Sequence, residues 1–276
     1  MNKPLLAAFA ALAIAGASAA PAAAGTRKPA PATHAVTFAG SVSFACSGSV
    51  VRFPDSRDSD PALVMSVGHC VESGLIPAGE VLVDQPSSRT FGLLDSAGTQ
   101  VATLTSSKLA YATMTDTDVA LYELTTTYGE IRSSYGVNPL TIQDTHPTAG
   151  TPVTVVSGYW KQTDTCDIDG FTPQLKEAEW TFDDSVRLSS GCQLIGGDSG
   201  SPVIDSTTGR VVAVANTVNE DGESCTLNNP CEVAADGTVT VRPGTGYGQE
   251  TYQIPACFGR DSQLDLSAKG CKLPKP

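Results

Sequence analysis

Short apolar runs separated by turn residues fill the chain from His34 onward, and no stretch keeps a helical period. The runs are rich in Val, Thr, Ser and Phe and are bounded by Gly, Pro, Asn and Asp, which is typical of β-strands joined by turns. We therefore predict an all-β protein. The strands predicted in the first half are 36–38, 41–44, 49–53, 62–67, 81–83, 91–94, 101–104, 108–111 and 119–124.

A second set of strand-like runs begins at Thr151, after a segment from 128 to 148 that is rich in Gly, Pro, Asn and Ser. Such clusters mark loops, so we interpret this segment as the crossover between two β halves. We place the halves at 36–140 and 141–276. No long helix is predicted, although the tail from Asp261 has room for one or two turns. The predicted strands of the second half are 151–160, 174–180, 185–188, 202–205, 210–215, 238–241 and 250–254.

The N-terminus has the pattern of a secretory signal, with a charge at Lys3 followed by a run of Leu, Ala, Ile, Phe and Gly. We expect 1–24 to be the signal peptide and 25–35 to be a short flexible segment. A membrane anchor is the alternative, but the apolar run is short and rich in alanine, which favours removal. The mature protein is expected to be secreted and free of the membrane. Small residues fit cleavage after Ala19, Ala20 or Ala24.

Eight cysteines in an exported chain predict disulfides, because disulfides persist outside the cytosol. The chain has no Cys-x-x-Cys pair and only three histidines, so we predict neither a metal site nor a cofactor. The net charge of -12 argues against nucleic acid as a partner, since a phosphate backbone requires a basic surface.

One glycine-rich segment, 196–202 (Gly-Gly-Asp-Ser-Gly-Ser-Pro), has the composition of a loop that presents a nucleophile. Glycines on both sides of the Asp-Ser pair let the backbone turn sharply and leave room for a reacting carbonyl. Ordinary turns use the same residues, so catalysis also requires a base and a group that orients it. The amides of Gly197 and Ser199 are candidates for stabilising an oxyanion.

The base that such a serine needs is best supplied by His69, which ends the apolar run 63–67. A lone histidine is more often a surface or core residue, but a neutral imidazole accepts a serine proton well near pH 7. Asp118 directly precedes a Val-Ala-Leu run, so we expect it at the mouth of a strand, where it can hold the imidazole tautomer. Asp116 is the alternative, but we expect it to be solvated in a turn.

Three segments in this order resemble the signature segments of the chymotrypsin/trypsin-like serine proteases: 68–70 (Gly-His-Cys), 118–121 (Asp-Val-Ala-Leu) and 197–202. The segment that begins at Cys46 also resembles the family's segment before its histidine. The resemblance covers about residues 36–257. It implies a double β-barrel with the active site in the cleft between the barrels. The implied roles are Ser199 as nucleophile, His69 as general base and acid, Asp118 as orienter, and the amides of Gly197 and Ser199 as the oxyanion hole.

The chain departs from this family pattern near the substrate. It lacks the Ile-Val-Gly-Gly-like start whose amine pairs with the Asp before the serine in animal members, so Asp198 has another partner or none. Secreted bacterial members often lack that start, so the chain resembles a bacterial exported protein. The substrate-pairing segment corresponds to Ala215, Asn216 and Thr217, where Thr217 replaces a glycine and should narrow the pocket entrance. Gln193 is expected at the pocket floor, and a neutral amide there argues against a preference for Arg or Lys.

The resemblance also pairs Cys46 with Cys70. The remaining six cysteines leave an alternative open, because Cys192 suits either Cys166 or Cys225 and spacing does not choose between them. With the first choice, the pairs are Cys166–Cys192, Cys225–Cys231 and Cys257–Cys271.

These residues together predict a secreted serine endopeptidase, a monomer whose partners are peptide or protein substrates and a protein inhibitor acting in trans. An esterase using the same triad is one alternative. The other is a latent or inactive protein that acts by binding. The intact His69, Asp118 and Ser199 favour catalysis over binding alone.

Overall fold

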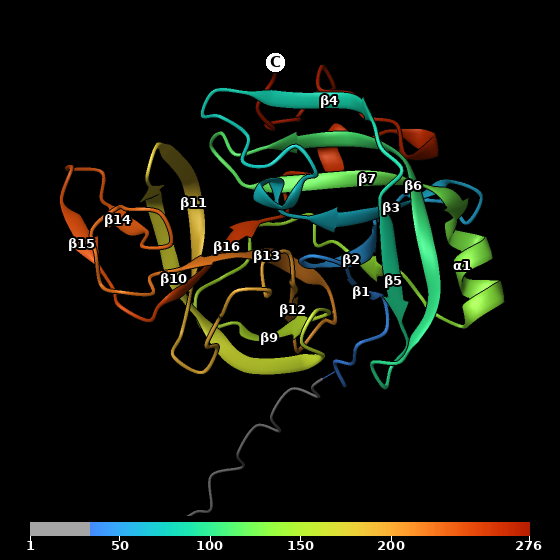
Figure 1. Ribbon diagram of the computed structural model, residues 1–276, viewed down its shortest axis with the longest axis horizontal. Helices are drawn as coiled ribbons and strands as arrows, with labels where there is room; N and C mark the ends of the chain where they lie inside the picture. The colour runs from blue at the N-terminus through green and yellow to red at the C-terminus, as the bar shows by residue number, and fades with distance from the viewer. Residues whose placement is uncertain (1–33) are drawn as a thin grey trace, which may run out of the picture. The chain divides into compact units, whose positions relative to one another are not determined.

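The computed structural model describes residues 34–276, and the predicted signal peptide lies outside them. Within these residues, strands β1 to β16 form two sheets with few helical turns (Figure 1). The structure confirms the predicted all-β class. No helix in the described part combines the length and the apolar character that a membrane span requires.

The first sheet closes into a barrel. Its strands pair in the order β1-β5-β6-β7-β3-β2, and pairing between β1 and β2 completes the ring. Strand β4 pairs with β6, and β8 adds to β2 in parallel. The strands are β1 (Ser41–Ser43), β2 (Ser47–Arg52), β3 (Pro61–Ser66), β4 (Val81–Pro86), β5 (Thr90–Leu94), β6 (Gln100–Thr113), β7 (Val119–Thr127) and β8 (Leu140–Thr141).

The second sheet also closes on itself. Its strands pair in the order β11-β16-β13-β12-β9-β10, and pairing between β10 and β11 completes the ring, while β14 and β15 extend from β10. The double barrel implied by the resemblance is thus confirmed. The strands are β9 (Pro152–Ser157), β10 (Gln162–Glu177), β11 (Trp180–Leu188), β12 (Pro202–Asp205), β13 (Val211–Val218), β14 (Cys231–Val233), β15 (Val239–Val241) and β16 (Gly246–Glu250).

The structure differs from the predicted strand pattern in several places. The runs 101–104 and 108–111 are parts of one long strand, β6, because the polar residues between them stay in the ladder with β7. Most of β10 was not predicted, since its exposed, polar positions carry no apolar run. The residues 36–38 lie outside any strand. Of the predicted strand 250–254 only Glu250 belongs to a strand, because the chain turns at 251–254, where the Ile254 amide donates to the Thr251 carbonyl. Strand β14 was not predicted.

A short helix, α1 (Tyr128–Tyr135), occupies the crossover where none was predicted. Its start is a capping box, in which the Thr127 hydroxyl accepts from the Glu130 amide and the Glu130 carboxylate accepts from the Thr127 amide. Gly136 ends it with a φ of 66°, a conformation that glycine adopts readily. The sequence signal was therefore the Thr-x-x-Glu pattern and the glycine rather than apolar periodicity.

Apolar side chains fill both barrels and the contact between them. Val50 and Phe91 are fully buried in the first barrel, and Val203 is fully buried in the second. Burying each such side chain contributes about 1.5–3 kcal/mol. Leu63 of the first barrel belongs to the same apolar cluster as Val214 of the second. The two barrels therefore share a packed interface that holds the segments at their junction in place.

The C-terminal tail returns to the first barrel, although it follows the second in sequence. It contains two short 3-10 helices, η2 (Pro255–Cys257) and η3 (Arg260–Ser262). The Tyr111 hydroxyl donates to the Pro274 carbonyl at 3.0 Å, and the Ser262 hydroxyl donates to the Pro61 carbonyl at 2.7 Å. These contacts fasten the tail to β6 and β3.

All eight cysteines form disulfides. The pairing implied by the resemblance, Cys46 with Cys70, is confirmed. The open choice at Cys192 is decided in favour of Cys166, because β10 passes directly beside the segment before Ser199. The other two pairs are Cys225–Cys231 and Cys257–Cys271.

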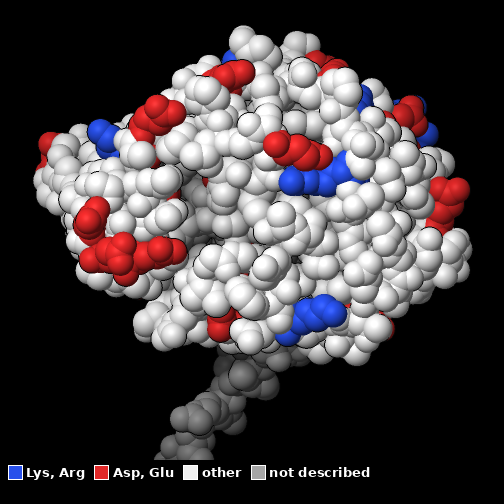
Figure 2. Space-filling view, viewed as in Figure 1, with Lys and Arg blue, Asp and Glu red and all other residues white. Residues whose placement is uncertain are grey.

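Acidic side chains are spread over the face seen in Figure 2, with one group on the side where Figure 1 places β14 and β15. The blue Lys and Arg side chains on this face are few and separated from one another. This distribution agrees with the net charge of -12.

Candidate active site

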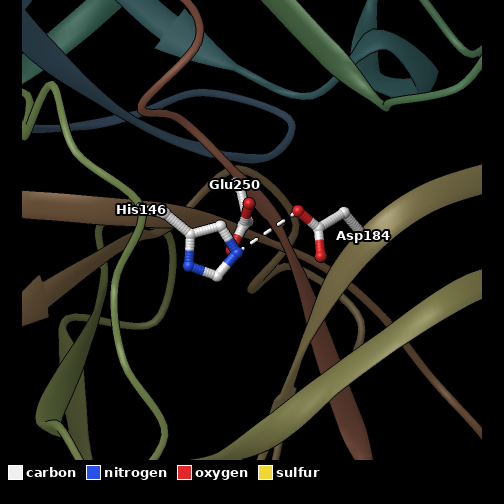
Figure 3. A group of neighbouring side chains, drawn as sticks. All are labelled: His146, Asp184 and Glu250. Carbon is white, nitrogen blue, oxygen red and sulfur yellow. Dashed lines mark ion pairs between the residues drawn. The ribbon is translucent and has the colours of Figure 1, made fainter.

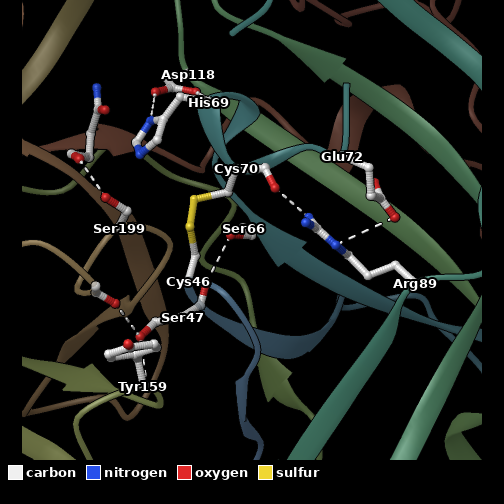
Figure 4. Close-up of a disulfide and its surroundings, with 12 residues drawn as sticks. Cys46, Ser47, Ser66, His69, Cys70, Glu72, Arg89, Asp118, Tyr159 and Ser199 are labelled. Atoms are coloured by element: carbon white, nitrogen blue, oxygen red, sulfur yellow. Dashed lines mark hydrogen bonds and ion pairs between the residues drawn. A yellow bond between two sulfur atoms is a disulfide. The ribbon is translucent and has the colours of Figure 1, made fainter. Parts of the chain in front are cut away.

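His69 and Asp118 are in direct contact on the first barrel. His69 lies in a short 3-10 turn, η1 (Gly68–Cys70), directly after β3, and Asp118 lies directly before β7. The distance from His69 Nδ1 to Asp118 Oδ2 is 2.6 Å, and the backbone amide of His69 donates to Asp118 Oδ1 at 3.1 Å (Figure 4). Asp118 therefore binds both the ring and the backbone of His69, and it is fully buried.

The glycine before His69 permits this contact. A Cβ atom at Gly68 would lie 2.2 Å from the Thr113 carbonyl and 2.9 Å from Asp118 Oδ1. No other residue fits between the end of β6 and the carboxylate without displacing one of them. The Cys46–Cys70 disulfide holds the other side of the turn, so the imidazole is anchored from both neighbours in sequence.

Ser199 lies in the loop before β12 of the second barrel, and β2 of the first barrel holds this loop. The Ser47 amide donates to the Ser199 carbonyl at 2.9 Å, and the Ser47 hydroxyl donates to the Gly197 carbonyl at 2.9 Å. Gly200 has a φ of +88°, and a Cβ there would lie 2.0 Å from the Ser47 carbonyl. The glycine after the serine is therefore required by the close approach of the two barrels.

The Ser199 hydroxyl faces the cavity that His69 and Asp118 also line. Its Oγ donates to the Asn216 carbonyl at 3.4 Å (Figure 4), and within residues 34–276 no hydrogen bond joins it to His69. A serine side chain changes rotamer about a single bond. In sites without substrate, the hydrogen bond between nucleophile and base is often long or misaligned.

Two backbone amides in this loop are available to a ligand. In the described part of the chain, neither the Gly197 amide nor the Ser199 amide donates to a protein acceptor. Unpaired amides beside a serine hydroxyl have the donor groups that an oxyanion site requires. These are the two amides that the sequence analysis singled out.

Asp198 finds its partner within its own loop. It is 4% exposed, and its Oδ2 accepts from the Ile195 amide at 2.9 Å. No ion pair among the described residues includes Asp198. Burial raises the pKa of Asp164, and the charge of Asp198 raises it further, so the neighbourhood of Asp198 is acidic. The Asp198 carboxylate thus has a backbone amide of its own loop as its hydrogen-bond partner.

The four residues predicted to bind substrate divide into two pairs. Asn216 and Thr217 line the cavity beside Ser199. Ala215 is fully buried in the core of the second barrel, and Gln193 is exposed outside the cavity lining. Leu194, the next residue along the chain, lines the cavity instead of Gln193.

The hairpin of β10 and β11 forms a wall of the cavity that the sequence analysis missed. Glu177, Trp180 and Phe182 line the cavity from this hairpin. The Trp180 indole donates to the Ile76 carbonyl at 2.8 Å, which ties the hairpin to the first barrel. These residues reach the site because the second barrel closes through the pairing of β10 with β11. A contact of this kind leaves no local motif in the sequence.

Glu177 is the main unexpected charge in the cavity. It is 7% exposed, and its Oε1 accepts from the Asn228 amide at 2.7 Å. Burial raises the pKa of Glu177 above its usual value. Glu177 is thus a second acidic group near His69, in addition to Asp118.

The pKa of His69 is raised above 6.5. Burial opposes protonation, but the charge and the hydrogen bond of Asp118 outweigh it, and the charge of Glu177 acts in the same direction. The imidazole is therefore a stronger base than a free histidine. Its Nδ1 is bound to Asp118, which leaves Nε2 as the nitrogen available for proton transfer.

Comparison with protein families finds a match along most of this region. The model described as trypsin-like peptidase domain matches residues 46–214. This range begins at Cys46 and contains His69, Asp118 and Ser199. No curated protein matches the chain.

The chain is also similar to several solved structures. An inactive mutant form of Rv3671c from M. tuberculosis H37Rv is 16% identical, with 76% of this chain and 80% of that chain covered and a TM-score of 0.45. The protease Anisep from Arthrobacter nicotinovorans is 16% identical, with coverages of 80% and 90% and a TM-score of 0.44. Nocardiopsis protease is 16% identical, with coverages of 77% and 90% and a TM-score of 0.43.

Proposed function

This chain belongs to the trypsin-like peptidase family, and from that premise we propose that it is a secreted serine endopeptidase acting through an acyl-enzyme on Ser199. The observation that carries the proposal is the bond between His69 and buried Asp118 in the same cavity as the Ser199 hydroxyl. The proposal is supported by the position of these three side chains, which come from both barrels to one cavity as a base, an orienting carboxylate and a nucleophile would.

In the proposed reaction, His69 Nε2 takes the proton of the Ser199 hydroxyl as Oγ attacks the carbonyl carbon of the scissile peptide. The negative charge that develops on the carbonyl oxygen is stabilised by the amides of Gly197 and Ser199. The imidazolium then gives its proton to the leaving amine, and the C–N bond breaks. Water, deprotonated by the same imidazole, hydrolyses the ester and restores Ser199.

Asp118 has two roles in this proposal. It fixes the tautomer by accepting from Nδ1, and it stabilises the imidazolium that forms during both proton transfers. Its burial strengthens both effects, because little water screens the pair. Substrate side chains would contact Asn216 and Thr217 and the β10–β11 hairpin across the cavity.

Secretion is supported by the signal-like N-terminus and by the four disulfides. A disulfide-rich chain of this kind folds stably in an oxidising compartment. We propose that the mature protein is a monomer that meets peptide or protein substrates outside the cell.

One observation favours a second candidate, a latent protein that acts by binding. The Ser199 hydroxyl is directed to the Asn216 carbonyl rather than to His69 (Figure 4). If this contact persisted in solution, the nucleophile would keep its proton. An esterase would use the same triad and differ only in the acyl group that it accepts.

The proposal is tested by labelling the purified, oxidised mature protein with a fluorophosphonate probe, followed by assay on casein and on a simple ester. We expect labelling of the wild type and cleavage of casein. Absence of labelling in a folded sample would support the latent protein. Labelling with ester hydrolysis and no cleavage of any protein substrate would support the esterase.

The raised pKa of His69 predicts the pH dependence of the activity. Only the neutral imidazole accepts the Ser199 proton, so kcat/KM should fall as the pH decreases through a value above 6.5. Asp118 and Glu177 are the charged groups that face the ring and set this direction. Measuring kcat/KM on one chromogenic peptide from about pH 5 to about pH 9 checks it. An acid limb at or below 6.5 would contradict the described pairing of His69 with Asp118.

A further inference from the structure

Three side chains from separate segments converge outside the cavity of Ser199. They are His146, from the connection between β8 and β9, Asp184, from β11, and Glu250, at the end of β16 (Figure 3). The distance from His146 Nε2 is 3.3 Å to Asp184 Oδ2 and 3.0 Å to Glu250 Oε1. None of the three lines the cavity beside Ser199.

The backbone fixes the tautomer of His146. Its Nδ1 is hydrogen-bonded to the Pro147 carbonyl, which can only accept, so Nδ1 carries a proton. In the neutral ring, Nε2 then presents its lone pair to the two carboxylates. Histidines that bind metal ions commonly donate their other N–H to a backbone carbonyl in this way.

Glu250 is buried without a hydrogen-bond partner. Its side chain is 3% exposed, and neither carboxylate oxygen has a hydrogen bond among the described residues. A buried carboxylate is costly, so such groups are normally protonated, paired with a cation or bound to a metal ion. Glu250 is directed at His146 Nε2, and Figure 3 shows both carboxylates on the same side of the ring. The three donor atoms, which all lie within 4.8 Å of one another, are therefore grouped around one point.

We propose that His146, Asp184 and Glu250 bind one divalent transition-metal cation, with Zn²⁺ as the best match to the donor set. A divalent charge balances the two carboxylates, and the neutral imidazole supplies the nitrogen ligand that Ca²⁺ and Mg²⁺ sites rarely use. Metal–ligand bonds of about 2.0–2.2 Å place neighbouring ligand atoms about 3 to 3.5 Å apart. The separations of 3.3 Å and 3.0 Å from His146 Nε2 fall in this range.

Part of the cluster is accessible to solvent, and part of it packs against aromatic rings. His146 and Asp184 are 40% and 42% exposed at their side chains, so water can complete the coordination from the solvent side. The His146 ring packs on Phe171 at 4.6 Å and on Tyr252 at 5.2 Å between centroids. These rings hold the imidazole in position, and a cation there would link β11, β16 and the connection between the barrels.

The site was not expected from sequence, because its three ligands are far apart in the chain and form no spaced motif. It is independent of the proposed peptidase activity. Its expected consequence is stability, since a ligand that binds only the folded state raises the free energy of unfolding by an amount that grows with the logarithm of its free concentration relative to Kd.

The test is calorimetric titration of the tag-free mature protein with Zn²⁺ after EDTA treatment and dialysis. We expect one Zn²⁺ per chain, and a rise in Tm of about 5–10 °C at a hundredfold excess over Kd. His146→Ala and Asp184→Asn should each weaken binding by about 100-fold or more. Tm values measured in EDTA establish that each variant is folded, and the exposed Asp184 provides the gentler substitution.

Matched controls use the other histidines and a neighbouring aspartate. His34→Ala, His69→Ala and Asp183→Asn should retain stoichiometric Zn²⁺ binding. Unchanged binding in His146→Ala, or loss of binding in His69→Ala instead, would overturn the assignment. Absence of Zn²⁺ binding to the wild type would overturn the proposal. It would mean that a proton, on His146 or on one of the carboxylates, balances the negative charge of the cluster instead of a metal ion. Tighter binding of Ca²⁺ than of Zn²⁺ would overturn the assignment of the cation class.

Discussion

Replacing Ser199 with alanine is expected to lower kcat on a peptide substrate by about 10⁶-fold, because the acyl-enzyme no longer forms. Fluorophosphonate labelling should disappear in the same variant. The fold should be unaffected, since the only hydrogen bond of the Ser199 hydroxyl in the described chain is the 3.4 Å contact with Asn216. Steady-state kinetics and a thermal melt measure the two effects separately.

Ser201 provides a matched control two residues away. It is fully buried, and its hydroxyl has no hydrogen-bond partner among the described residues. Ser201→Ala should therefore keep both activity and labelling, with stability equal to or above that of the wild type. If Ser201→Ala abolished labelling while Ser199→Ala retained it, the nucleophile would have been misassigned.

His69→Ala should cost about as much as Ser199→Ala, and the double variant should cost little more than either. The reason is that base and nucleophile act in one step, so the loss of either removes the whole contribution. Additive losses would show that the two residues act independently, and would contradict the proposed proton transfer from Ser199 to His69.

Replacing Asp118 with asparagine is expected to lower kcat by about 10⁴-fold with a much smaller change in KM. An asparagine amide can donate to the ring, so it no longer enforces a proton on Nδ1 and a lone pair on Nε2. Loss of the charge that raises the pKa of His69 should also move the acid limb of the pH profile to lower pH. Both readouts come from kinetics measured across the pH range.

Asp116→Asn is the control for this substitution. Asp116 was the alternative orienter on sequence grounds, and the structure leaves its side chain exposed, whereas Asp118 is fully buried against His69. Activity should stay within about twofold of the wild type, as is usual for surface substitutions. A 10⁴-fold loss in Asp116→Asn, with Asp118→Asn active, would reverse the assignment.

Features that depend on neighbours in sequence were predictable. Glycines around Ser199, a histidine at the end of a strand and an aspartate at the start of another are local patterns with local steric reasons. The capping box of α1 was local too, and the pattern from Thr127 to Gly136 would have revealed it. Alternating apolar runs found most strands but not β10, whose polar positions follow no such pattern.

The amino-acid sequence by itself predicted the all-β class, which the structure confirms, and it supplied the two predicted halves and the candidate catalytic residues. Only the tertiary structure decided that Cys192 pairs with Cys166, that Glu177 walls the cavity, and that His146, Asp184 and Glu250 meet. These contacts follow from barrel closure, which makes neighbours of strands far apart in the chain. The local preferences of a sequence segment do not indicate which distant strand it will pair with. A closed barrel decides this, because its packing allows few other arrangements of the strands.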